Sequence, residues 1–169
     1  MKRNTLFKLL IDISFYLLIP VVFLFPSAIL YVLVFPEQEI IKLSTGSVSG
    51  GNWATILILL GVYAEYVLFL VGFYNLRKFA TLLLKNKIFT KASVQCTKKI
   101  GQFFTICGAS FLLLKLIYAL VASNEYSIEF GISDIQLYLF LVIIGVFFLI
   151  LSNAFERAMD LKDENDLTV

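Results

Sequence analysis

Four long apolar segments, separated by shorter polar ones, dominate the chain. They cover approximately residues 6–35, 53–76, 100–123 and 135–155. Each is long enough to cross the hydrocarbon core of a bilayer as a helix, which needs about 20 residues. The pattern therefore predicts an all-α integral membrane protein, a single domain over residues 1–169 with four transmembrane helices in an antiparallel bundle.

Amphipathic stretches continue the second and fourth segments. After the second segment, apolar residues recur at helical spacing at Leu76, Phe79, Ala80, Leu83, Leu84 and Ile88. The fourth segment continues in the same way through Phe155, Ala158 and Met159, and Thr90 is placed to cap the helix that enters the third segment. We therefore expect helical extensions of about two turns into the cytosol.

Two prolines interrupt the first segment. Pro20 and Pro26 each remove a backbone donor from the helix, which frees carbonyls near Tyr16 and Val22. In lipid these carbonyls need partners from neighbouring helices or side chains, so this part of the first segment is expected to face protein.

Composition narrows the function classes. The chain is 60% hydrophobic and 15% charged, with a mean hydropathy of +0.91, whereas soluble domains are about half apolar and about a quarter charged. It contains no His and no recognisable catalytic motif. Its two cysteines, Cys96 and Cys107, would lie about 16 Å apart on one helix, too far for a disulfide. We expect no enzymatic activity, no cofactor, no metal site and no direct binding of nucleic acid.

The distribution of Lys and Arg predicts the orientation. Of the 14 basic residues, all except Lys42 and Lys115 lie at the N-terminus, between the second and third segments, or after the fourth. Because Lys and Arg accumulate on the cytoplasmic side, both termini are predicted to be cytoplasmic. With this orientation, the Gly- and Ser-rich residues 42–52 are expected to form a flexible outer loop. Their composition is similar to that of a phosphate-binding loop, but they lie on the outer side of the membrane and lack the Gly-Lys-Ser/Thr ending of such loops. The lipid bilayer is then the first predicted partner.

Three ionisable residues, Asp12, Glu65 and Lys115, lie within the apolar segments. Such residues are costly in a membrane and are expected to be paired or to face a cavity. The depths and leaning directions of Glu65 and Lys115 make an ion pair between them reasonable, either as a structural lock or as part of a ligand or ion site. Asp12 is expected to reach the interface or to accept bonds from neighbours near Tyr16.

Small residues on the third segment indicate a close helix contact. Gly101, Thr105 and Ala109 recur at every fourth position, a pattern that allows helix backbones to approach in membranes. The row predicts tight packing within the chain or, as an alternative, a homodimer face.

Two motifs carry a resemblance to a known family. They are Leu84-Lys-Asn-Lys-Ile-Phe-Thr-Lys-Ala-Ser-Val94 and the C-terminal stretch Phe155-Glu-Arg-Ala-Met-Asp-Leu-Lys-Asp-Glu-Asn-Asp-Leu-Thr-Val169. With the four-segment layout, the chain resembles the bacterial membrane family catalogued as domain of unknown function 2975 (DUF2975). The resemblance implies a bacterial inner-membrane location and no assigned activity. It also implies a partner, since members are often encoded beside a small helix-turn-helix regulator. Lys91-Ala92-Ser93 departs from the family, which commonly has an acidic residue there.

Charged residues near the predicted cytoplasmic surface are the candidate partner-binding residues. They are Arg77, Lys78, Lys85 and Lys87 after the second segment, and Asp160, Asp163, Glu164 and Asp166 in the acidic tail over residues 156–169. The tail is either a solvated helix end or a dock for a basic DNA-binding partner. The leading hypothesis is a regulatory or sensory membrane partner of a helix-turn-helix transcription regulator. The alternative is a small transporter or permeability protein that uses Glu65 and Lys115.

Overall fold

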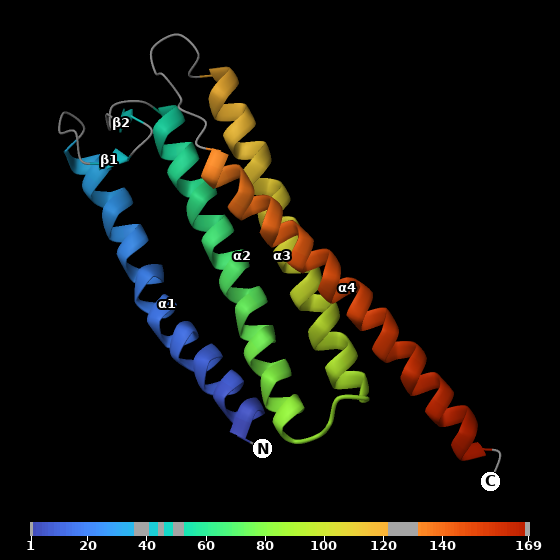
Figure 1. The fold of residues 1–169 in the computed structure, drawn as a ribbon. Coiled ribbons are helices and arrows are strands. Elements are labelled where there is room, and N and C mark those ends of the chain that lie inside the picture. The colour runs from blue at the N-terminus through green and yellow to red at the C-terminus, as the bar shows by residue number, and fades with distance from the viewer. Residues whose placement is uncertain (1, 36–40, 44–45, 49–52, 122–131, 168–169) are drawn as a thin grey trace.

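Four long helices and one small hairpin make up the computed structural model, which describes residues 2–35, 41–43, 46–48, 53–121 and 132–167 (Figure 1). The elements in chain order are α1 (Lys2–Val34), β1 (Ile41–Leu43), β2 (Gly46–Val48), α2 (Trp53–Leu84), α3 (Lys91–Val121) and α4 (Ile132–Leu167). The all-α prediction is confirmed for the body of the protein. Within residues 42–52, expected as a flexible loop, β1 and β2 instead pair antiparallel, with Ile41 opposite Val48.

The helices alternate in direction and pack in chain order (Figure 1). The main contacts join α1 to α2, α2 to α3, and α3 to α4. Among the described residues, α1 has no comparable contact with α3 or α4. The antiparallel bundle is therefore open between its first and last helices.

Three helices are long and apolar enough to cross a membrane. The qualifying stretches are Asn4–Tyr31 in α1, Leu59–Leu84 in α2 and Ile135–Lys162 in α4. The third predicted span, residues 100–123, is not among them, and its last two residues lie outside the described part of the chain. The structure thus supports a multi-pass membrane protein.

The turn between α2 and α3 has well-defined caps at both ends. The amide of Asn86 donates to Leu83 O at 3.2 Å and that of Lys87 to Leu82 O at 3.0 Å, the two bonds of a Schellman motif. Asn86 has a φ of 55°, a left-handed conformation that Asn tolerates better than most residues. The helix therefore ends at Leu84, four residues before the predicted amphipathic stretch ends. Thr90 Oγ1 accepts from the Ser93 amide at 3.4 Å, as expected for the cap of α3.

Glycines bring the backbones of α3 and α4 together. A Cβ on Gly101 would lie 2.8 Å from Gly145 O, and one on Gly145 would lie 2.5 Å from Thr105 N. Gly101 and Thr105 therefore serve packing within the chain, as the first reading of the small-residue row predicted. Ala109, the third member of that row, is exposed instead.

The buried core lies towards the end of the bundle where α2 and α3 are joined. Its centre consists of Phe79, Cys96, Ile100 and Phe104. Three small polar residues are almost fully buried in the same region: Ser93, Thr97 and Ser152. Ser152 Oγ of α4 donates a hydrogen bond to Val94 O of α3 at 3.0 Å. Near the prolines of α1, the Tyr66 hydroxyl donates to Leu18 O at 2.7 Å. Leu18 O is not one of the carbonyls that the prolines free, and Pro20 itself is exposed, so the expectation that this part of the helix faces protein stays a prediction.

Candidate functional site

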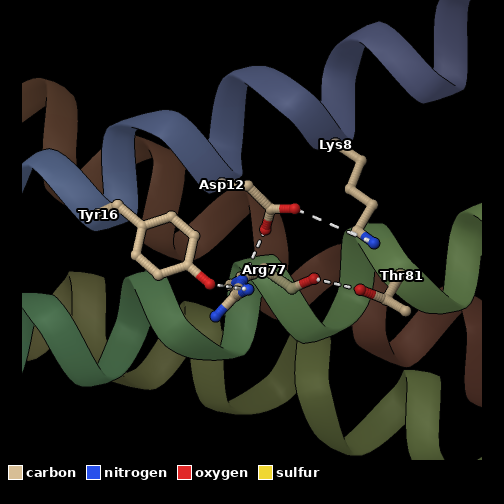
Figure 2. Close-up of polar contacts among 5 residues, drawn as sticks. All are labelled: Lys8, Asp12, Tyr16, Arg77 and Thr81. Carbon is tan, nitrogen blue, oxygen red and sulfur yellow. Dashed lines mark hydrogen bonds and ion pairs between the residues drawn. The ribbon is translucent and has the colours of Figure 1, made fainter.

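Asp12 of α1 forms an ion pair with Arg77 of α2 (Figure 2). Arg77 Nε donates to Asp12 Oδ1 at 2.6 Å, and its Nη2 donates to the Tyr16 hydroxyl at 2.9 Å. Lys8, one turn before Asp12, lies 4.0 Å from the other carboxylate oxygen. The guanidinium carbon is 4.9 Å from the centre of the Tyr16 ring, within the range of a cation–π contact. This cluster neutralises Asp12 and joins α1 to α2.

Arg77 therefore has a role within the chain that the sequence interpretation missed by assigning it to partner binding. Asp12 is paired, as expected for an ionisable residue in an apolar segment. The sequence did not name Arg77 as its partner, and Tyr16 contacts Arg77 as well. The depths of Asp12 and Arg77 along their helices are compatible with the pair but do not identify it, because the sequence does not say which side of α1 meets α2. Asp12 and Arg77 both lie near the predicted cytoplasmic ends of their helices, so their side chains occur at similar levels.

Glu65 lies in the apolar interior of the bundle, at the middle of α2. Its side chain is 6% exposed, and neither carboxylate oxygen has a hydrogen-bond partner among the described residues. One turn of α3 passes close by, since Cys107 Sγ contacts Glu65 O at 3.6 Å. A buried carboxylate without a partner is energetically expensive, so Glu65 stands out among the described side chains of the spanning helices.

The Lys115 side chain lies outside the described part of the structure, so the Glu65–Lys115 pair stays a prediction. Both cysteines are free and buried, in agreement with their predicted separation. Among the described residues, no group of three or more Cys, Asp and Glu side chains is arranged to hold a metal ion.

The remaining charged candidates lie on the exposed surface at one end of the molecule. Lys78, Lys85 and Lys87 are exposed around the end of α2. Asp160 and Glu164 are exposed on α4, while the side chains of Asp163 and Asp166 lie outside the described set. Helix α4 extends past the start of α3 (Figure 1), so its acidic end forms the outermost helical surface there.

Aromatic contacts hold α4 to the α2–α3 turn just before this acidic end. The Phe155 ring lies 6.2 Å from that of Phe79 on α2 and 5.9 Å from that of Phe89 in the turn. The inward side of this part of α4 is formed by Phe155, Ala158 and Met159, as the periodicity predicted, and Glu156, Arg157 and Asp160 are exposed. The direction in which α4 leaves the bundle is thus defined by packing.

Comparison with known proteins gives one finding. A family model described as protein of unknown function (DUF2975) matches residues 15–169. No curated protein and no solved structure matches the chain.

Proposed function

The chain belongs to the DUF2975 family, whose function is unknown, and we propose that it is a non-enzymatic membrane protein that holds a small helix-turn-helix transcription regulator at the cytoplasmic surface. In this proposal all four helices cross a bacterial inner membrane, and both termini face the cytosol. The support for this orientation is the concentration of Lys and Arg at one end of the helices.

The projecting end of α4 is the observation that carries the proposal. The helix continues to Leu167 and presents exposed Asp160 and Glu164, with Leu161 between them at 61% exposure. A helix-turn-helix protein has a basic surface with which it contacts DNA phosphates. An acidic helical end with an apolar side chain in its centre is complementary to such a surface in charge, and it would compete with DNA for it.

The way in which α4 is anchored also favours a docking role. Phe155 packs against Phe79 and Phe89, and the bond from Ser152 to the α3 backbone lies one turn earlier. A partner would therefore meet a helix with a defined direction, which lowers the entropy cost of binding. The exposed lysines at 78, 85 and 87 lie at the end of the neighbouring helix α2 and extend the same surface with the opposite charge.

Co-purification tests the proposal. The tagged full-length protein, extracted in mild detergent, is expected to retain the helix-turn-helix protein encoded beside its gene. Retention should weaken as salt is raised from about 50 to 500 mM, because the Debye length then shortens from about 14 to about 4 Å.

A matched pair of variants separates docking from general charge effects. Neutralising four acids of the tail should abolish retention: Asp160→Asn, Asp163→Asn, Glu164→Gln and Asp166→Asn. The control neutralises four acids in the predicted outer segments and should leave retention intact: Glu37→Gln, Glu39→Gln, Glu125→Gln and Glu129→Gln. No retention at low salt, or equal loss in both variants, would contradict the proposal.

A further inference from the structure

A cavity of about 640 Å³ opens between α1 and α4, with α2 and α3 contributing to its walls. On α2 it is lined by one helical face, at positions 62, 65, 66, 69, 73 and 76. Residues from the other three helices complete the lining, among them Phe25, Phe104 and Leu141. Its volume is that of a site for a small organic molecule.

The chemistry of the lining is uniform apart from one side chain. The walls are aliphatic and aromatic, and Glu65 is the one charged residue among the described residues that line the cavity. The lining also contains two tyrosines. The Tyr66 hydroxyl already donates to Leu18 O. The Tyr138 ring stacks on the Phe111 ring, with 3.6 Å between the two ring centres. The cavity therefore combines an apolar surface with a single buried carboxyl group.

Glu65 has no charged partner among the described residues, and the hydroxyl of the nearby Ser110 donates to Cys107 O instead. Both of its oxygens are buried, and neither has a hydrogen-bond partner among the described residues. A positive charge inside the cavity would compensate it, because attraction between opposite charges persists over several ångströms in a medium of low dielectric. The faces of the surrounding rings, such as the stacked Phe69 and Phe104, also attract cations.

Entry from the bilayer fits the rim of the cavity. Leu137 and Phe140 of α4, and Phe7 of α1, line it and are themselves exposed, at 63%, 59% and 41%. An apolar rim on helices that cross the membrane admits a molecule dissolved in lipid more readily than one dissolved in water.

We propose that this cavity binds a lipophilic organic cation, with an apolar or aromatic body held by the rings and its positive charge compensated by Glu65. The inference does not depend on the proposed docking of a regulator, since it rests on a different part of the molecule. In combination, the two would make the cation a signal that is sensed within the membrane.

Binding of radiolabelled tetraphenylphosphonium to the full-length protein in detergent tests the inference. The wild type is expected to bind this cation and not tetraphenylborate, an anion of nearly the same size and shape. Glu65→Gln should weaken binding of the cation at least about thirtyfold, the smaller end of what is lost when one partner of a buried charge pair is removed. Glu156→Gln removes an exposed carboxylate outside the cavity and should leave binding unchanged.

A second variant keeps the test independent of the folding of Glu65→Gln. Val62→Trp fills part of the cavity one turn from Glu65 and should also weaken binding, while the protein stays monodisperse in size-exclusion chromatography. Equal binding of the phosphonium and the borate, or undiminished binding in Glu65→Gln, would overturn the inference. Binding that appears only in Lys115→Gln would overturn it as well, by showing that Lys115 already neutralises Glu65.

Discussion

The close contact between α3 and α4 makes a sharp prediction for Gly145. Substitution by Ala places a Cβ 2.5 Å from the Thr105 amide nitrogen and 3.0 Å from Gly101 O, whereas unstrained contacts lie near 3.5–4.0 Å. The Cβ would also meet the Thr105 hydroxyl, which can rotate away, but the two backbone atoms cannot, so the helices must separate by about 1 Å. Overpacking of this kind typically costs about 1–3 kcal/mol, and against backbone we expect the upper half of that range.

The gain from removing a glycine offsets part of this cost. Ala is favoured over Gly in a helix by about 0.5–1 kcal/mol, which leaves a net loss of about 1–2.5 kcal/mol for Gly145→Ala. At about 2–4 °C per kcal/mol for a chain of this size, Tm should fall by about 2–10 °C. Gly61→Ala is the matched control, because its Cβ would meet only the Leu114 side chain, at 3.1 Å, and its Tm should stay constant or rise.

A thiol-reactive fluorogenic dye provides the assay. Cys96 and Cys107 are both free and buried, so they react with the dye as the detergent-solubilised protein unfolds during a temperature ramp. If Gly145→Ala were as stable as Gly61→Ala, the α3–α4 contact would be looser than described, and the reasoning from backbone clashes would be refuted.

Three further predictions concern the turn, the thiols and the topology. Asn86→Gly should be neutral or stabilising, whereas Asn86→Val should lower the free energy of unfolding by about 1–2 kcal/mol, because a β-branched residue resists a φ of 55°; equal Tm values for the two would contradict the cap. Burial raises the pKa of the Cys96 thiol, although the positive charges of Lys78 and Lys99 act in the opposite direction. Little thiolate therefore exists at pH 7, and maleimide labelling of the folded protein should be slow and should accelerate with pH. Rapid labelling at pH 7 would show that the two lysines outweigh burial. In a background without native cysteines, Ser49→Cys should react with an impermeant reagent added to intact cells and Asn165→Cys should not, and the reverse pattern would invert the proposed orientation.

The helices were predictable from the sequence because each apolar run has about 20 residues or more. Such a run fits a membrane-spanning helix and is much longer than an ordinary β-strand. The cap at Thr90 and the inward side of α4 at Phe155 followed from local patterns that do not depend on neighbouring helices. The partner of Asp12 did not follow, since α1 is apolar on nearly all sides and its pattern does not say which side meets α2. A cavity was one of two surroundings expected for Glu65, but its walls could not be predicted, because they depend on the open side of the bundle between α1 and α4.

Cross-linking inside cells tests the central proposal most directly. A photoreactive amino acid placed at Leu161, which is exposed between the acids at the end of α4, is predicted to cross-link to the neighbouring helix-turn-helix protein on illumination. The same probe at Leu139, which is exposed near the start of α4 and lies in the predicted fourth span over residues 135–155, should give no such product. A regulator that is present in the cells but is cross-linked from neither position, or equally from both, would contradict the docking role of the α4 end.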